Sequence, residues 1–284
     1  IKGENEVVSN LLKSGVSIVD GGDEKNLEMM LSKATAVVYG VTAMNFDRYM
    51  LAEKSCRFEL NEFFRDSLRM SERISKEICR WGLKAIYLSS TEVYKAKSVL
   101  INENDDVVKG RNSFTRHKIE EENIFLENCS RCVVLRIADV NGRLRMYEDY
   151  ECGGILAEIY KAYKNKKILR VDVGYETKDG SRLYDVISIN NLGNVVFSAI
   201  NWLDNFEVKK EIFNISSGRM LTLKDLVKIF EGIYGRVYVS FDEKKEGDRD
   251  CGRICSYMKA FNILGYIPQQ RAEVIVENLN NKVK

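Results

Sequence analysis

Three groups of side chains in this sequence have the chemistry to act on a ligand. A run of hydroxyls ending in a carboxylate, Ser89–Glu92, follows a short apolar stretch. A second segment carries Phe114 and, one helical turn later, the only histidine, His117, followed by Lys118. Histidine titrates near neutral pH, so this segment could transfer protons. The third group consists of seven cysteines.

The cysteines include two close pairs, Cys129/Cys132 and Cys251/Cys255, each of which could supply half of a zinc site. The two halves would have to meet in space, and no histidine lies near either pair. An odd number of scattered cysteines in a chain of this size favours reduced thiols in a cytoplasmic protein. We therefore expect packing thiols, a cytoplasmic location and no metal site.

The composition excludes several classes of partner. The 284 residues are 45% apolar and 30% charged, as in a globular protein with one large or two modest domains. With 44 basic and 42 acidic residues, the chain has no electrostatic reason to bind nucleic acid or an acidic membrane. No apolar run is long enough to span a membrane. The first residues are too polar for a secretory signal and lack Met, so we expect a processed form or an excerpt.

Short β-branched runs alternate with amphipathic stretches in the first half of the chain. The expected strands are Val16–Val19, Ala36–Val41, Lys84–Ser89 and Arg131–Ile137. The expected helices are Glu4–Lys13, Asn26–Ser32, Glu59–Trp81 and Ser113–Asn128. Alternation of this kind, with strands that are apolar throughout, predicts an α/β fold with a parallel sheet covered on both faces.

The alternation loosens after residue 142, which indicates a smaller mixed domain. The expected helices there are Gly153–Lys164, Asn191–Leu203 and Thr222–Tyr234, with two more around Pro268. The expected strands are Ile168–Val171, Asp185–Ile189, Ile212–Ile215 and Val237–Phe241. Thr222 and Asp225 have the spacing of a helix-capping pair.

Four segments together resemble a known family. They are AIYLSSTEVY from Ala85, SFTRHKIEEENIF from Ser113, VVLRIADVNG from Val133, and the late pair LYDVISINNLGNVVFSAI and EIFNISSGRMLTLKDLVKIF. In this order they resemble the extended short-chain dehydrogenase/reductase family, and within it the NAD-dependent epimerases and dehydratases such as UDP-galactose 4-epimerase and dTDP-glucose 4,6-dehydratase. Each motif alone is weak, and their joint order carries the resemblance.

The resemblance implies a Rossmann-like doubly wound sheet followed by a substrate-binding domain. Residues 1–142 would form a truncated dinucleotide-binding domain, and 143–284 would mainly bind substrate, with 183–203 returning to the sheet. The family opens with a glycine-rich turn that holds a pyrophosphate, and no such turn precedes the first strand here. We expect either a truncation or a natural loss of the first βαβ unit.

The family's catalytic residues are carried only in part. A tyrosine takes the proton from a sugar hydroxyl, a lysine four residues on lowers its pKa, and a Ser or Thr holds the hydroxyl. Ser90 and Lys118 match the serine and lysine, but Phe114 stands at the tyrosine position, and a phenyl ring accepts no proton. Catalysis is therefore expected to be impaired. His117 at the next turn could substitute, although a supporting or surface role is favoured.

Glu92 matches a glutamate that eliminates water in the dehydratases, but the paired aspartate is replaced by Thr91. Epimerisation is therefore favoured over dehydration, and Glu92 could equally be a solvent-facing loop residue. Two further tyrosines, Tyr94 and Tyr184, fit core or substrate-pocket positions better than that of a base.

The resemblance also assigns ligand contacts. Asp23, Val41 and Lys118 would contact the cofactor. This cofactor could be NAD or NADP, because the strand that distinguishes the two is absent from the sequence. Asp139, Tyr184, Arg182 and Lys245 would contact the nucleotide sugar. Asp139 replaces the family's asparagine and Lys245 an arginine, which suggests weakened or altered binding of the diphosphate.

The leading hypothesis is therefore an NAD-dependent nucleotide-sugar epimerase or dehydratase with compromised catalysis. The alternative is an inactive homologue that serves as a binding or scaffold subunit. An unrelated doubly wound protein remains only if the late segments match by chance. A homodimer through a four-helix contact of Glu59–Trp81 with Ser113–Asn128 is expected.

Overall fold

The computed structural model describes residues 24–40, 57–96, 100–108, 113–141, 155–172, 182–242, 252–268, 271–277 and 279. The expected helix Glu4–Lys13 and strand Val16–Val19 lie outside these residues. Within them, helices and strands alternate through the first half of the chain, as the sequence predicts.

A four-stranded parallel sheet forms the centre of the molecule. Its strands are β1 (Ala36–Tyr39), β2 (Lys84–Ser90), β3 (Arg131–Ile137) and β8 (Lys209–Ile215), in the order β1-β2-β3-β8. The apolar side chains of β2 and β3 are buried, apart from the partly buried Leu88, as expected for parallel strands covered on both faces. The predicted Rossmann-like α/β fold is confirmed.

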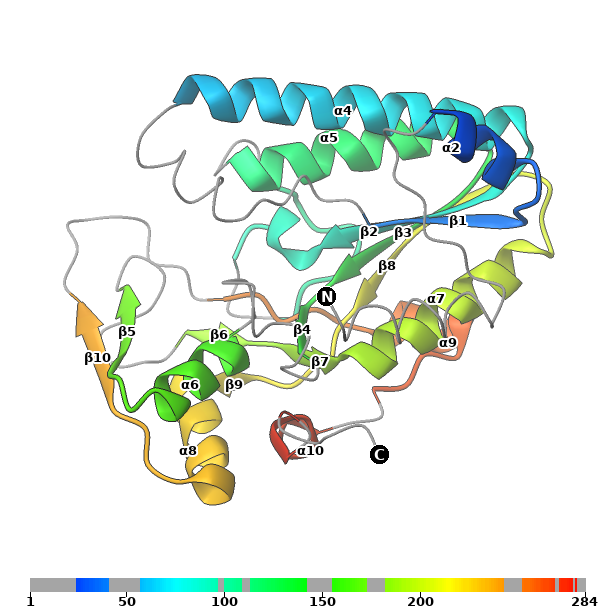
Figure 1. The fold of residues 1–284 in the computed structure, drawn as a ribbon. Coiled ribbons are helices and arrows are strands. Elements are labelled where there is room, and N and C mark those ends of the chain that lie inside the picture. The colour runs from blue at the N-terminus through cyan, green and yellow to red at the C-terminus, as the bar shows by residue number, and fades with distance from the viewer. Residues whose placement is uncertain are drawn as a thin grey trace.

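Helices cover both faces of this sheet (Figure 1). One face carries α2 (Glu24–Leu31), α4 (Arg57–Arg80) and α5 (Ser113–Asn128), with α4 and α5 packed together. The other carries α7 (Ile189–Leu203) and α9 (Met258–Leu264). Each face has its own apolar core, with Ile78 and Phe125 in the first and Leu203 and Phe213 in the second.

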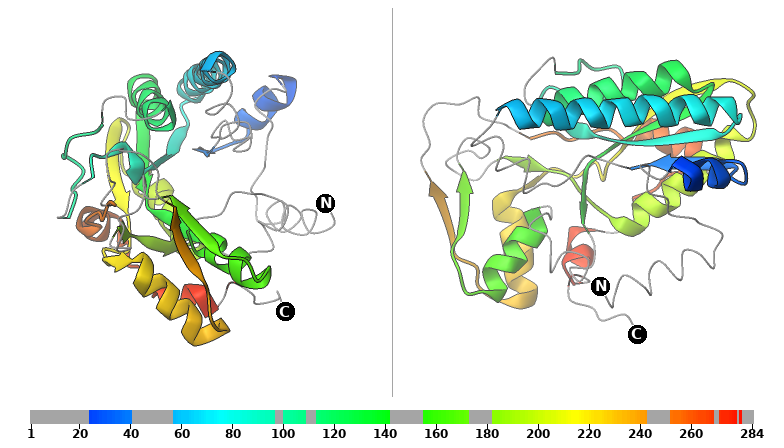
Figure 2. Two further views of the ribbon diagram at one scale, coloured as in Figure 1. Left: turned by 90° about the vertical axis from the view of Figure 1, so that its left-hand side faces the viewer. Right: turned by 45° about the horizontal axis from the view of Figure 1, so that its top comes forward.

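A second lobe lies beyond the carboxyl ends of the strands (Figures 1 and 2). It contains α6 (Ile155–Lys164), β5 (Leu169–Asp172), α8 (Leu223–Tyr234), β10 (Val239–Asp242) and α10 (Ala272–Glu277). Strands β5 and β10 pair in parallel, and α8 packs against both α6 and α10. This lobe has a separate core around Leu156, Leu226 and Phe230.

Short pairings join the sheet to the second lobe. Strand β4 (Asp139–Asn141) pairs in parallel with β7 (Val186–Ser188), and β6 (Leu183–Tyr184) pairs antiparallel with β9 (Leu221–Thr222). A single 3-10 turn, η1 (Thr91–Val93), follows β2. These segments bring the end of β2, the start of β4 and the residues around 182–184 to one edge of the sheet.

The element boundaries differ from the expected ones for identifiable reasons. Strand β8 begins at Lys209 rather than Ile212, because the polar residues Lys209 and Lys210 still pair with β3. Helix α7 begins two residues early, where Ser188 and Asn191 form a capping box that the sequence analysis did not predict. The predicted Thr222–Asp225 capping pair is confirmed at the start of α8.

No helix among the described residues is long and apolar enough to cross a membrane.

Candidate functional site

Ser90 lies at the carboxyl end of β2, where ligands bind in open parallel sheets. Its Oγ accepts a hydrogen bond from the backbone N–H of Glu92 at 3.1 Å, and it thereby caps η1. The side chain is half-buried. The hydroxyl keeps its proton available for a further acceptor, because the bond to Glu92 uses only a lone pair.

Lys118 reaches the same end of β2 from helix α5. Its Nζ donates to the carbonyl oxygen of Leu88 at 3.2 Å, two residues before Ser90 on the strand. The side chain is buried, and its ammonium lies 5.1 Å from the centre of the Tyr87 ring. Burial lowers the pKa of Lys118, although Glu121 and Glu122 partly oppose this effect.

Phe114 lies in the first turn of α5, half-buried, one helical turn before Lys118. The neighbouring candidates for a base point elsewhere. His117 is buried with its Nε2 3.2 Å from Ser67 Oγ on α4. The hydroxyl of Tyr94 is buried and donates to Asn214 Oδ1 at 2.7 Å, so Tyr94 occupies a core position. Neither side chain contacts Ser90 or Lys118 through a hydrogen bond.

Glu92 is held by two arginines. Its carboxylate lies 3.0 Å from Nη1 of Arg253 and 3.8 Å from Nη2 of Arg182. The Glu92 side chain is 41% exposed, whereas those of Arg253 and Arg182 are 2% and 15% exposed. Arg253 is fixed further by the bond from its Nε to the carbonyl of Tyr94 at 2.6 Å. Glu92 is thus an ion-paired residue at the rim of the site.

Asp139 and Tyr184 lie close to Arg182. Asp139 Oδ2 accepts the backbone N–H of Ile155 at 3.2 Å, which caps the first turn of α6. Burial raises the pKa of Asp139 to about 6, opposed by that hydrogen bond and by the charge of Arg182. The guanidinium of Arg182 lies 5.1 Å from the centre of the Tyr184 ring.

Three predicted ligand contacts, Asp23, Val41 and Lys245, lie outside the described residues. The same is true of Cys251, one member of the second cysteine pair. In the part of the chain that the structure describes, no cluster of three or more His, Cys, Asp or Glu side chains could hold a metal ion. Cys129, Cys132 and Cys255 are buried free thiols.

Several interactions at this edge involve residues that the sequence analysis missed. Arg253 lies in a segment without a matching motif, so nothing in its context distinguished it. Glu121 and Glu122 belong to a run of three glutamates that is typical of a solvated helix face, yet both are buried. Glu122 forms a two-pronged ion pair with the buried Arg136, with contacts of 2.7 and 3.0 Å. Their helical positions facing the sheet were the available signal.

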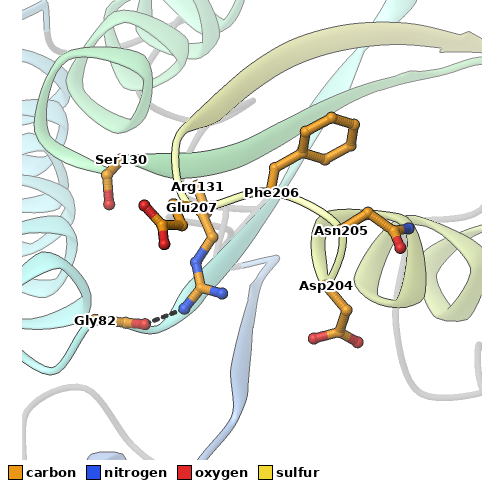
Figure 3. A pocket seen from close by; sticks show the side chains of 7 residues that line it. All are labelled: Gly82, Ser130, Arg131, Asp204, Asn205, Phe206 and Glu207. Atoms are coloured by element: carbon orange, nitrogen blue, oxygen red, sulfur yellow. Dashed lines mark hydrogen bonds between the residues drawn. The ribbon is translucent and has the colours of Figure 1, made fainter.

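A separate open pocket of about 380 Å³ lies at the opposite end of the sheet (Figure 3). It is formed where β2, β3 and β8 begin, and Arg131 there donates to the carbonyl of Gly82. Asp204 on its rim is paired with Lys84 Nζ at 2.5 Å. Its lining is polar, and it contains none of the predicted site residues. The lining residues are Gly82, Ser130, Arg131, Asp204, Asn205, Phe206 and Glu207.

The sequence profile described as "NAD dependent epimerase/dehydratase family" matches residues 52–216, more than half of the chain. The chain belongs to this family. The matched residues include β2, α5 and β3, which together position Ser90 and Lys118. No curated protein sequence matches the chain at a significant level.

Solved structures of this family have the same fold. The UDP-glucose-4-epimerase of Stenotrophomonas maltophila, with bound NAD and formylated UDP-arabinopyranose, superposes with a TM-score of 0.78 at 15% identity, over 93% of this chain and 81% of that one. The UDP-glucuronic acid 4-epimerase of Bacillus cereus, in complex with UDP-glucuronic acid and NAD, gives a TM-score of 0.76 at 17% identity. The match covers 96% of this chain and 84% of that one.

A tyrosine-to-phenylalanine variant of the Bacillus cereus enzyme is also similar. It is in complex with UDP-4-deoxy-4-fluoro-glucuronic acid and NAD. It gives a TM-score of 0.72 at 18% identity, over 93% of this chain and 79% of that one. At these identities, the similarity shows that this family member shares the fold of these proteins.

Proposed function

We propose that this family member binds NAD and a nucleotide sugar, and that Phe114 severely limits its epimerase chemistry. The observation that carries the proposal is the meeting of Lys118 with the end of β2 beside Ser90. Ser90 would orient a sugar hydroxyl through its available proton, and Lys118 would contact the cofactor ribose. Bound NAD would accept a hydride from the sugar and return it. By the resemblance, Phe114 would stand where the family's tyrosine accepts the hydroxyl proton, and its phenyl ring cannot accept one.

On the substrate side, we propose that Arg182, Tyr184, Asp139 and Lys245 contact the nucleotide sugar. Arg182 is the best supported of these, because it lies 3.8 Å from the carboxylate of Glu92, which follows the end of β2. Glu92 is proposed to act on the sugar, as the dehydratase resemblance implies. Asp23 and Val41 would contact the cofactor, together with Lys118. The sheet half, residues 1–142 with 183–203, would bind NAD or NADP, and the rest would bind substrate.

The test is restoration of the missing proton acceptor by Phe114→Tyr. We expect the native chain to bind NAD by calorimetry and to interconvert UDP-sugar epimers slowly or not at all. Phe114→Tyr should raise the turnover by about 10²–10⁴-fold, the usual contribution of a general acid–base group. Phe114→Leu is the matched control, since it alters the side chain at the same position without adding a hydroxyl.

The result that would overturn the impaired-enzyme proposal is a native turnover that Phe114→Tyr does not raise, because another base must then act. The second candidate, a scaffold or binding subunit, is favoured by the presence of Phe114 at the position of the family's tyrosine. It predicts that the native chain binds no dinucleotide and that Phe114→Tyr creates no turnover. We also propose a cytoplasmic location and a homodimer in which α4 and α5 form the contact.

A further inference from the structure

A fully buried carboxylate, Glu121, lies between α4, α5 and β2. Its Oε1 accepts the hydroxyl of Ser71 on α4 at 2.7 Å, and its Oε2 accepts the hydroxyl of Tyr87 on β2 at 2.7 Å. Its accessible surface is 0%. A glutamate so deeply buried would be costly to keep in the apolar layer unless it were paired with a charge and with hydrogen-bond donors.

Two nitrogen groups on the same helix complete the surroundings of Glu121. Lys118 Nζ lies 3.6 Å from Oε2, and His117 Nε2 lies 3.4 Å from Oε1. Burial alone would raise the pKa of Glu121, but the bond from His117 and the charge of Lys118 outweigh it and lower the pKa. The carboxylate is therefore held in its ionised form inside the protein.

The position of Lys118 depends on the same carboxylate. Its ammonium is fixed from three sides: the Leu88 carbonyl at 3.2 Å, Glu121 at 3.6 Å and the Tyr87 ring at 5.1 Å. Tyr87 is itself tied to Glu121, so two of these three contacts act through one residue. Burial would otherwise favour a neutral amine.

We propose that Glu121 is a positioning residue that holds the Lys118 ammonium at the end of β2, ready for the ribose hydroxyls of a dinucleotide. This inference rests on the proposed cofactor role of Lys118. The ionisable groups that face this pair are Glu122 and His117 from α5, Tyr87 from β2 and Tyr39 from β1, the last through Ser71. Among the described side chains of helix α4, those of Ser67 and Ser71 contribute hydroxyls.

The first experiment measures the coupling between the two side chains by a double-mutant cycle on NAD affinity. The variants are Glu121→Gln, Lys118→Met and the double variant, with calorimetric binding of NAD at pH 7 and pH 9. Glutamine has nearly the same shape: its amide oxygen can still accept from Tyr87, while its NH2 group can donate to the hydroxyl oxygen of Ser71, so the packing is retained. We expect Glu121→Gln to weaken NAD binding about tenfold, as for loss of one charge-assisted hydrogen bond, and more strongly at pH 9. In the Lys118→Met background the same change should have no effect.

The matched control is Glu120→Gln, which removes a carboxylate from the exposed neighbour on the same helix and should leave NAD binding unchanged. An equal effect of Glu121→Gln in both lysine backgrounds would show that it perturbs the fold rather than Lys118, and would overturn the proposal. The proposal also fails if Glu121→Gln folds normally and changes neither the affinity nor its pH dependence.

A second experiment separates this inference from the proposed function. The protein is labelled with ¹³C at the lysine ε-carbons, Lys118 is assigned from the Lys118→Met spectrum, and its titration is followed by NMR without any ligand. We expect Glu121→Gln to lower the pKa of Lys118 and Glu120→Gln to leave it unchanged. If native protein binds no NAD but this shift is seen, the cofactor proposal fails while the Glu121–Lys118 coupling stands. No shift would overturn the coupling itself.

Discussion

The carboxyl group of Asp139, at the start of β4, has surroundings that shift its pKa in opposite directions. Its carboxylate caps α6 through the Ile155 N–H, and Arg182 stabilises its charge, while burial and the neighbouring charge of Glu92 destabilise it. The balance raises the pKa from 3.8 to about 6. The folded state binds the proton of the Asp139 carboxyl group more tightly than the unfolded chain does. The protonated carboxyl group therefore contributes stability that is fully present below about pH 4 and is lost as the pH rises through about 6.

We therefore predict that Asp139→Asn stabilises the protein at pH 7.5 by about 2 kcal/mol and leaves it nearly unchanged at pH 4. Asparagine can still accept the Ile155 N–H through its side-chain oxygen. Urea unfolding of both proteins at the two pH values measures the difference. Asp66→Asn, on the exposed face of α4, is the control and should change little. Equal unfolding free energies of the two proteins at pH 7.5 would show that the ionised Asp139 carboxylate does not destabilise the folded state.

At this scale the sequence predicted residue types better than their surroundings. Ser90 and Lys118 were identified from the resemblance of their segments to the family's motifs, and the structure brings them to the same end of one strand. Glu121 could not be identified in this way, because its neighbours Ser71 and Tyr87 come from segments far apart in the chain. Their convergence depends on how α4 packs over α5, which no local pattern encodes.

The junction between β6 and the segment that carries Arg253 depends on one glycine. Gly252 has φ of +84°, and a Cβ atom there would lie 1.9 Å from the carbonyl oxygen of Leu183. Leu183 and Gly252 form a β-bridge, so the two backbones run in direct contact. The close approach places Arg253 beside Glu92, and any side chain at position 252 must push the two segments apart.

We predict that Gly252→Ala destabilises the protein by about 3 kcal/mol, more than a positive φ alone would cause. The matched control is Gly82→Ala, where φ is +61° but no atom lies within 4 Å of the added Cβ. That change should cost about 1 kcal/mol from backbone strain alone. Thermal unfolding distinguishes them, and similar losses for both variants would show that the contact with Leu183 is unimportant.

Among the elements, the strands of the central sheet were the most predictable. In β2 and β3 the central residues form an apolar run, because these two strands are covered on both faces. Helix α8 was also predictable, since Thr222 and Asp225 mark its start. Strand β7 lies within the expected strand Asp185–Ile189. The short strands β4, β6 and β9 were not predicted, because two or three residues carry no periodicity and their pairing partners are distant. The joining of the two lobes is therefore a tertiary property.

For the whole molecule, the surface of α4 determines how polar the proposed dimer contact would be. The outward face of α4 carries charged pairs, such as Arg69 with Asp66 at 3.1 Å and Lys76 with Glu72 at 2.6 Å. All four side chains are more than half exposed. An interface built on this face would be largely polar, so its association should weaken as salt screens the charges.

We predict that Arg69→Glu reduces the dimer fraction in sedimentation velocity, because the reversal leaves a cluster of like charges facing its symmetry mate. Lys224→Glu, on the exposed surface of α8 in the second lobe, makes the same change in net charge and should leave the dimer fraction unaltered. Raising the salt concentration should reduce association of the native chain as well. Equal effects of both substitutions would exclude α4 as the contact.

The described chain passes back and forth between the sheet and the second lobe. It enters the lobe at α6 and β5, returns for β7, α7 and β8, re-enters at α8 and β10, returns again for α9, and ends in α10 (Figure 1). A single cut in any one connection would therefore release neither half, since the remaining crossings still tether them. Any movement of one half relative to the other would therefore involve several connections of the chain together.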